Sequence, residues 1–178
     1  FGRATGKFIQ EELKSGGGVS SASKEDINNS LERLNYLNES KSGYETADVK
    51  RELQECMQNY FGVFRRGDFM EKGLTELSEI RNKVENLHLK DKSDAFNTSR
   101  VEAIELQNLF EVAEATAISA FERNESRGAH ARDDFPDRDD DNWLCHSLYD
   151  PITKSISKRD VNFAPSQVEA FPPIVRTY

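Results

Sequence analysis

The sequence predicts a mainly α-helical protein: an antiparallel three-helix bundle like a spectrin repeat, followed by a β-hairpin and an extended tail. Apolar residues recur at helical spacing in three long runs between residues 46 and 126, which indicates three amphipathic helices. The connections between these runs are short, as in bundles whose successive helices are antiparallel. After residue 126 the composition changes to an acidic stretch and then to two short segments that are typical of paired strands.

Residues 1–14 are expected to form a short helix, because Phe8, Ile9 and Leu13 recur at helical spacing. Residues 15–45 are interpreted as a linker with a short helix, since three consecutive glycines are followed by serines and Ser23 has the position of a helix N-cap. The glycines lack the spacing of a P-loop and of a dinucleotide-binding turn. A flexible linker is therefore favoured over a phosphate-binding loop.

The bundle is predicted over residues 46–126, with Thr46 as the cap of its first helix. Each run has an apolar stripe that we expect to form the core rather than a cofactor site. The third run is apolar around more of its circumference, which indicates packing on more than one side. The expected core residues are Val49, Leu53, Cys56, Met57, Tyr60 and Phe64 in the first run, Met70, Leu74, Leu77, Ile80 or Arg81, Val84 and Leu87 in the second, and Val101, Ile104, Leu106, Leu109, Phe110, Val112, Ala113, Ala117, Ile118, Ala120 and Phe121 in the third.

Residues 127–178 are expected to hold an acidic loop, a β-hairpin and an extended tail. Six aspartates lie between residues 133 and 141, and the two strands are expected over residues 143–149 and 155–163. Pro172 and Pro173 favour an extended tail. Because a lone hairpin is only marginally stable in water, this part should pack against a region outside this sequence.

Composition and pattern exclude several classes of function. The chain has 24 Lys and Arg against 32 Asp and Glu, a net charge of −8, whereas a nucleic-acid-binding domain needs a basic surface. No apolar run approaches the ~20 residues of a membrane-spanning helix. Cys56 and Cys145 form no CxxC pair, so neither a zinc site nor a redox motif is indicated.

The acidic loop raises the possibility of a calcium site. If Asp137, Asp139 and Asp141 were the first three ligands of an EF-hand loop, glycine would be needed next and glutamate at the twelfth position. Those positions hold Asn142 and Leu148. A solvated or arginine-paired loop is therefore favoured over calcium binding.

The turn after the third helix is the most informative local feature. Arg127, Gly128 and His130 follow the helix directly, Arg132 comes two residues later, and the glycine allows the backbone to turn sharply. Two arginines, a histidine and nearby carboxylates suit a hydrogen-bonded joint between domains, and they also suit an anion site. His130 and His146 have no recognisable nucleophile nearby, so a structural role is favoured over general-base catalysis.

Several segments in series resemble the flavoprotein subunits of succinate dehydrogenase and fumarate reductase. The turn after the family's last bundle helix is similar to residues 125–136 (ESRGAHARDDFP), and that helix is similar to residues 105–109 (ELQNL). The other similar segments are residues 57–58 and 63–65 in the first bundle helix, 73–74 at the start of the second, 138–146 (RDDDNWLCH) at the C-terminal hairpin, 171–178 (FPPIVRTY) at the C-terminus and 1–6 (FGRATG) in the helix that closes the FAD-binding domain. Residues 14–41 carry no signature of the family.

By this resemblance, the parent enzyme oxidises succinate to fumarate at a covalently attached FAD and passes electrons through an iron-sulfur subunit to quinone. Because the chain starts at Phe1, without Met, a signal or a helix cap, we expect a piece of a longer polypeptide. The resemblance places the FAD attachment and every catalytic residue upstream of Phe1. No catalytic, cofactor-binding or metal-binding residue is therefore expected in this sequence, and the isolated fragment is expected to be inactive. Residues 1–14 would end the FAD-binding domain.

The resemblance also implies partners and a location. The expected partners are the FAD-binding and capping domains of the same subunit, the iron-sulfur subunit and, indirectly, membrane anchor subunits. The expected location is peripheral, on the cytoplasmic face of a bacterial inner membrane, or on the matrix side of the mitochondrial inner membrane in a eukaryote. The residues expected to form domain or subunit contacts are Arg127, His130, Arg132, Arg138, Trp143 and His146.

Two other interpretations stay open. L-Aspartate oxidases share the turn of residues 125–130 and the bundle, but they generally lack segments like residues 138–144 and 172–178. A stand-alone helical interaction module would instead be a gene product of this size. Between the two directions of the succinate–fumarate reaction, the tail resembles a dehydrogenase more than an anaerobic fumarate reductase.

Overall fold

The computed structural model describes residues 2–18, 20–165, 169–172 and 174. Contacts within the chain divide it into two compact units, Phe1–Glu39 and Ser40–Tyr178. The described residues are mainly helical, with a helical bundle and a small antiparallel hairpin in the second unit. The predicted fold class is therefore confirmed. The predicted extended tail falls partly on residues 166–168, 173 and 175–178, which lie outside the described residues.

The first unit contains helices α1 (Gly2–Lys14) and α2 (Lys24–Glu39). The Ser23 hydroxyl accepts the backbone N–H of Asp26 at 3.0 Å and donates to the Asp26 carboxylate at 2.6 Å, so α2 has the N-cap that its sequence predicts. The glycines follow the last turn of α1, where Gly16 has a φ of +89° and the Gly17 N–H donates to the Glu12 carbonyl. They end a helix rather than start one.

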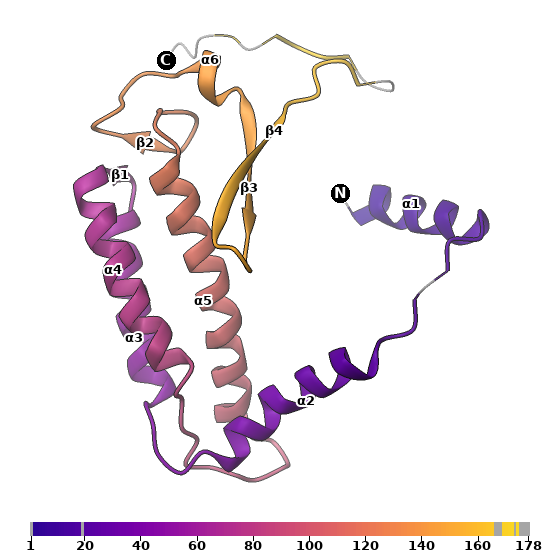
Figure 1. Cartoon of the computed structure of the whole chain (residues 1–178), viewed down its shortest axis with the longest axis vertical. Coiled ribbons are helices and arrows are strands. Elements are labelled where there is room, and N and C mark those ends of the chain that lie inside the picture. Colours follow the sequence, from indigo (N-terminus) through magenta and orange to yellow (C-terminus); the bar gives the residue numbers. More distant parts are fainter. Residues whose placement is uncertain (1, 19, 166–168, 173, 175–178) are drawn as a thin grey trace. The chain divides into compact units, whose positions relative to one another are not determined.

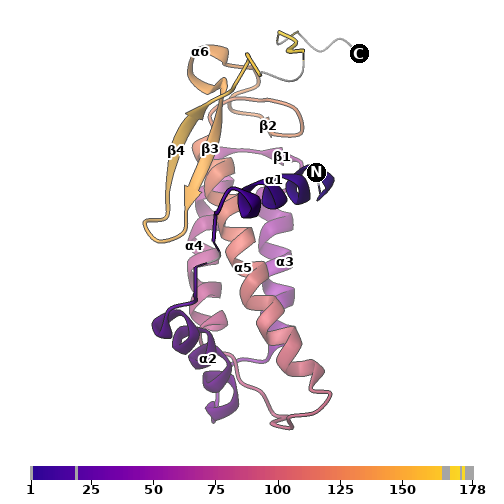
Figure 2. The same ribbon diagram turned by 90° about the vertical axis from the view of Figure 1, so that its right-hand side faces the viewer.

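The second unit is built on three helices, α3 (Thr46–Phe61), α4 (Gly67–Val84) and α5 (Thr98–Glu122), which lie side by side in Figures 1 and 2. Each helix contacts the other two. Gly73 lets α3 and α4 approach closely, because a Cβ there would lie 2.5 Å from the Tyr60 Cβ. The buried apolar residues of the three helices are Val49, Leu53, Cys56, Phe61, Met70, Leu77, Ile80, Val84, Ala103, Leu106, Phe110, Ala113, Ala117 and Ala120.

Some of the expected core residues are exposed. Phe64 is 76% exposed, because α3 ends at Phe61 and the chain turns there, so that Phe61 takes the core position instead. Val101 and Val112 are 55% and 64% exposed. They lie on the side of α5 away from the core. The predicted packing on more than one side is made instead by the hairpin, which contacts α5 in addition to α3 and α4. The expected cap Thr46 is the first helical residue, and Glu45 holds the N-cap position.

Two short sheets complete the second unit. Strand β1 (Phe64–Arg65) pairs in parallel with β2 (Ala131–Arg132), a contact that the sequence analysis did not predict. After the short helix α6 (Asp140–Trp143), β3 (Cys145–Asp150) pairs antiparallel with β4 (Ser155–Asp160), with Cys145 opposite Asp160. The hairpin packs along α5 of the same chain (Figure 1), whereas the sequence analysis expected it to pack against a region outside this sequence. The expected first strand began at Trp143, but this residue belongs to α6.

Candidate functional site

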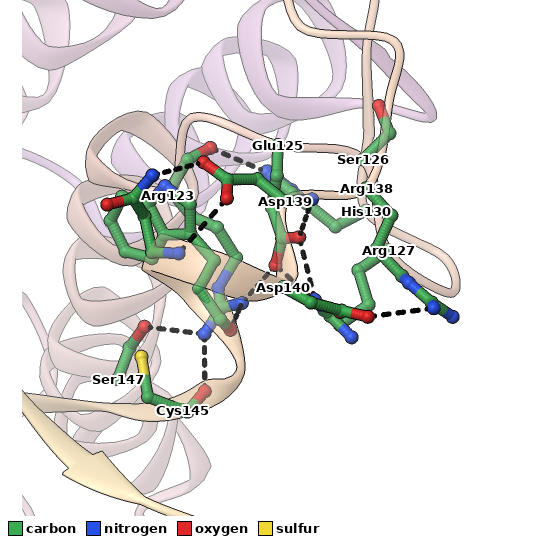
Figure 3. Close-up of polar contacts among 12 residues, drawn as sticks. Arg123, Glu125, Ser126, Arg127, His130, Arg138, Asp139, Asp140, Cys145 and Ser147 are labelled. Carbon is green, nitrogen blue, oxygen red and sulfur yellow. Dashed lines mark hydrogen bonds and ion pairs between the residues drawn. The ribbon is translucent and has the colours of Figure 1, made fainter. Parts of the chain in front are cut away.

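The site is a cluster of ion pairs around Glu125, just beyond the end of α5 (Figure 3). Glu125 is fully buried and accepts hydrogen bonds from the Arg123 guanidinium, from Arg127 Nε at 2.8 Å and Nη2 at 3.0 Å, and from the backbone N–H of Asp139 at 3.0 Å. Burial alone would raise the pKa of Glu125, but the donors and the positive charge of Arg127 outweigh it, and the pKa lies below its usual range. Glu125 is therefore a charged acid that is satisfied by its own chain.

Arg127 links this acid to the acidic loop. Its Nη2 lies 2.6 Å from Asp140 Oδ1, and the other oxygen of Asp140 lies 2.8 Å from Arg138 Nη2. The hydrogen bonds to Glu125 raise the pKa of Arg127 despite partial burial. Gly128, with a φ of +60°, allows the tight turn in which Arg127 and His130 exchange backbone hydrogen bonds. The loop of aspartates is thus paired with arginines here.

Arg132 joins the end of α5 to the start of α4. It is 3% exposed, and Nη1 donates to the carbonyls of Ala120, Phe121 and Arg123 at 3.0–3.3 Å, which are acceptors left open at a helix C-terminus. Its Nε and Nη2 bind the two oxygens of Asp134 at 2.7 and 2.8 Å. These bonds lower the pKa of Asp134, which also accepts the N–H of Gly67 at 2.9 Å.

His130 bridges two arginines of different elements. Its Nδ1 lies 2.7 Å from Arg65 Nη1, and its Nε2 lies 3.1 Å from the Arg123 carbonyl oxygen. Arg65 can only donate and the carbonyl can only accept, so the ring is neutral with its proton on Nε2. Burial, followed by the charges of Arg65, Arg132 and Arg123, lowers the pKa of His130 and outweighs the bond to the carbonyl.

Arg123 fixes the hairpin to the end of α5. It donates to the carbonyls of Trp143 at 3.0 Å and Cys145 at 2.7 Å, and its guanidinium carbon lies 5.1 Å from the centre of the Trp143 ring. The Lys158 ammonium lies 3.6 Å from the same ring centre. Trp143 is therefore a buried aromatic anchor within reach of two cations, Arg123 at the end of α5 and Lys158 on β4.

A second cluster, which the sequence analysis missed, lies halfway along α5. Glu114 is 8% exposed and binds the Arg81 guanidinium of α4 through both oxygens. It also accepts the Tyr149 hydroxyl at 2.9 Å, and Lys154 Nζ lies 3.6 Å away. The ambiguity between Ile80 and Arg81 on the core side of α4 was the one signal in the sequence, because an arginine beside a core face needs an acid opposite it.

The structure brings five of the six predicted contact residues together. Arg127 and His130 exchange backbone hydrogen bonds in the turn, Arg132 binds the Arg123 carbonyl beside it, and Arg138 pairs with Asp140. Trp143 is connected to the cluster because its carbonyl accepts a hydrogen bond from Arg123, which also binds Glu125. His146 is an exposed residue of β3 opposite Arg159 in the register; among the described residues it makes no ion pair with the cluster, but it lines a groove together with His130. Whether these residues contact another domain or subunit stays a prediction.

The chemistry open to this cluster is limited. The guanidinium groups of Arg123, Arg127 and Arg132 already bind carboxylates, which favours a structural joint over an anion site. Asp139, proposed and disfavoured above as a calcium ligand, caps α6 by accepting the Asn142 N–H. Within the described ranges no group of three or more His, Cys, Asp and Glu side chains is placed to hold a metal, and no helix is long and apolar enough to cross a membrane.

The second unit is a helical domain, a three-helix bundle whose last helix is joined to a β-hairpin by hydrogen bonds of Arg123 and Tyr149. Residues 50–178 match the family model described as "Fumarate reductase flavoprotein C-term". The chain belongs to this family, as the C-terminal domain of a flavoprotein subunit of the succinate dehydrogenase and fumarate reductase kind. The resemblance found in the sequence is thereby confirmed.

Individual relatives agree with the family. The chain is 40% identical to the succinate dehydrogenase flavoprotein subunit of Coxiella burnetii over 97% of its own length and 29% of the relative's. It is 33% identical to the mitochondrial succinate dehydrogenase flavoprotein subunit of Oryza sativa, over 100% of this chain and 29% of the relative. A solved quinol-fumarate reductase with menaquinol molecules superposes with a TM-score of 0.83 at 29% identity, over 98% of this chain and 30% of that chain. The chain thus spans less than a third of the proteins that it matches.

Proposed function

We propose that this chain is the C-terminal helical domain of a succinate dehydrogenase flavoprotein subunit. The parent enzyme would oxidise succinate to fumarate through a covalently attached FAD and pass the electrons through an iron-sulfur subunit to quinone. The names of the relatives in Coxiella burnetii and Oryza sativa support this assignment. The parent would lie peripherally on the cytoplasmic face of a bacterial inner membrane, or on the matrix side in mitochondria, next to membrane anchor subunits.

Within that enzyme we assign this domain a structural role. The observation that carries the assignment is the fully buried Glu125, which holds the end of α5, the turn and the start of α6 together. Such a satisfied network fixes one geometry and leaves no free nucleophile or base in it. The domain would pack on the FAD-binding and capping domains, and its turn and hairpin would help to form the docking surface of the iron-sulfur subunit.

The described residues do not fit an FAD site. A dinucleotide is held where a glycine-rich turn opens a helix after a strand, whereas the glycines here close α1. The arginines around Glu125 are occupied by carboxylates. When bound, FAD accepts the hydride and releases electrons singly. We therefore assign its binding to the part of the relatives that this chain does not span, and no step of the reaction to residues 1–178.

Flavin retention in the parent protein tests the assignment of the enzyme. An antibody raised against this chain should detect a polypeptide about three times as long, as its share of the relatives predicts. We expect that band to fluoresce as flavin after denaturing electrophoresis. A large band without fluorescence would instead point to an aspartate oxidase, and a band of the size of this chain would point to a stand-alone module.

The structural role is tested by Arg127→Ala in the full-length subunit. Removing this side chain leaves Glu125 and Asp140 without the arginine that binds both of them. Assembly with the iron-sulfur subunit or retention of FAD should therefore weaken. The matched control is Arg51→Ala, which removes an exposed arginine paired with Asp48 on α3. Normal assembly and turnover in Arg127→Ala would refute the role.

A further inference from the structure

An open groove runs along the side of α5 that faces away from the bundle core. It has a volume of about 720 Å³ and lies between the C-terminal half of α5 and strand β3, which run side by side in Figure 1. Its floor is formed mostly by short side chains of α5, with Glu111 and Arg123 also lining it, and its far wall is formed by the hairpin. The groove is lined by Val112, Thr116 and Ser119 of α5, by Tyr149 of β3, and by Arg65 and His130 at one end, among other residues.

Arg65 differs from the other arginines at this end of the bundle. Its Nε donates to the Phe61 carbonyl at 3.3 Å and its Nη1 to His130 Nδ1 at 2.7 Å, and both of these acceptors are neutral. Among the described residues no carboxylate pairs with it, whereas Arg123, Arg127 and Arg132 each have one. Burial, together with the charge of Arg132, lowers the pKa of Arg65. A half-buried cation without a counter-charge is costly, and a carboxylate from outside would relieve that cost.

We propose that this groove receives a carboxylate-bearing segment of the same flavoprotein subunit, from the part that the relatives have and this chain lacks, and that the carboxylate pairs with Arg65. The inference rests on the proposed function. The chain spans 29% of the Coxiella relative, so most of the subunit is covalently joined to this domain at high effective concentration. The exposed Val112 and the short side chains of Thr116 and Ser119 allow such a segment to approach α5 closely.

Cysteine accessibility in the full-length flavoprotein subunit, expressed without its partner subunits, tests this proposal. Thr116→Cys places a thiol on the groove floor, and Thr75→Cys places one on an exposed position of α4. The two are matched, because each threonine hydroxyl donates to the carbonyl four residues earlier. The rate of maleimide labelling at each cysteine is measured by mass spectrometry of its peptide in the folded subunit, and it is divided by the rate at the same cysteine in urea. We expect labelling at position 116 to be slowed about tenfold or more relative to position 75.

Charge at position 65 is then varied in the Thr116→Cys subunit. Arg65→Gln should restore labelling about tenfold, since it removes a charge-assisted hydrogen bond, and Arg65→Lys should keep most of the protection. Arg66→Gln is the control, because the exposed Arg66 already pairs with Asp68. An unchanged rate at Thr75→Cys in the Arg65→Gln background shows that the bundle is still folded.

Three results would overturn the proposal: equal labelling at positions 116 and 75, protection that appears only when the iron-sulfur subunit is added, and protection that survives Arg65→Gln. The second result would make the partner subunit the occupant of the groove. Failure here is distinct from failure of the proposed function. A subunit with covalent flavin and an assembly defect in Arg127→Ala would keep the proposed function even if position 116 were fully accessible.

Discussion

The Tyr149 hydroxyl in the hairpin donates a 2.9 Å hydrogen bond to Glu114 in the middle of α5. The same carboxylate binds Arg81, so one buried acid joins α4, α5 and β3. Burial and the bond to Glu114 raise the pKa of Tyr149 to about 12. Burial would raise the pKa of Glu114 as well, but the bonds from Arg81 and Tyr149 outweigh it and keep the acid charged. The hairpin is therefore held to the bundle at two points, here and at Arg123.

Removal of this acid should destabilise the chain strongly. Glu114→Ala leaves Arg81 without its main partner and Tyr149 without an acceptor, so we expect the free energy of unfolding to fall by about 3–5 kcal/mol. The control Glu111→Ala removes an acid that is 57% exposed and 3.9 Å from Arg81, and should cost less than about 1 kcal/mol. Urea unfolding followed by the fluorescence of Trp143, the single tryptophan, measures both. Equal losses in the two variants would contradict this account.

Acid should weaken the same contacts. The pKa values of Glu114, Glu125 and Asp134 all lie below their ordinary values in the folded chain. Their contribution to stability is therefore complete above the ordinary glutamate value of 4.5 and is lost as the pH falls through the lowered values. We expect the urea midpoint to be nearly constant from about pH 7 to pH 5 with respect to these groups, and to drop below about pH 4.5. A smaller acid drop in Glu114→Gln would confirm the assignment.

His130 should add a second pH dependence, at higher pH. Its folded pKa lies below the ordinary 6.5, so its contribution is complete above pH 6.5 and decreases as the pH falls through the lowered value, since the unfolded ring takes up the proton first. Nitrogen chemical shifts at neutral pH should show a ring protonated on Nε2 only. His130→Gln should remove this part of the slope. A ring that carries protons on both nitrogens at pH 7 would show that the Arg65 contact is absent.

Arg132 should tolerate no substitution well. It is 3% exposed, and its guanidinium donates hydrogen bonds to three carbonyls at the end of α5 and to both oxygens of Asp134. Arg132→Ala should cost about 3–5 kcal/mol, and Arg132→Lys about 2 kcal/mol because one ammonium cannot reproduce a planar fork. Arg138→Ala, at the surface, should cost less than about 1 kcal/mol. If the Arg132→Lys chain were as stable as the parent sequence, the planar guanidinium of Arg132 would not be needed for stability.

Gly73→Ala should reverse the usual preference of helices for alanine. The added Cβ would lie 2.5 Å from the Tyr60 Cβ and 2.6 Å from the Phe61 Cε2, so α3 and α4 must move apart. We expect a loss of about 1–3 kcal/mol from overpacking. Ser78→Ala, on the exposed side of the same helix, should instead be neutral or stabilise by a few tenths of a kcal/mol. A thermal melt of both variants decides the sign.

The sequence predicted the parts of the fold that depend on periodicity. The spacing of Leu53, Leu77 and Leu106 marks the buried sides of three helices, and all three are buried. It placed Phe64 in the core wrongly, because helical spacing carries no signal for the point at which α3 ends. The direction in which the chain leaves a helix depends on tertiary contacts such as β1 with β2.

The sequence predicted which residues belong to the candidate site better than it predicted the groups to which they bind. Arg127, His130 and Arg132 attracted attention through composition and a glycine turn, and they do lie together: Arg127 and His130 exchange backbone hydrogen bonds, and His130 and Arg132 both bind the Arg123 carbonyl. Glu125 and Glu114 were not recognised as buried acids, because a glutamate in a polar sequence has no local feature that distinguishes a solvated side chain from a satisfied one. Glu114 is bound by Arg81 of α4 and Tyr149 of β3, which only the three-dimensional arrangement brings to it. The arginines that bind Glu125 are its near neighbours Arg123 and Arg127, but their spacing alone does not show that the acid is buried.

The parallel pairing of β1 with β2 has a consequence for the order of folding. Phe64 and Ala131 are joined across the whole of α4 and α5, so the loop between them must be closed before the pairing yields any energy. The helical bundle itself closes that loop, so we expect the side-chain contacts that cross it, Arg65 with His130 and Gly67 with Asp134, to form only afterwards. These contacts would thus form late in folding, and they would hold the C-terminal segment only against helices that have already packed correctly.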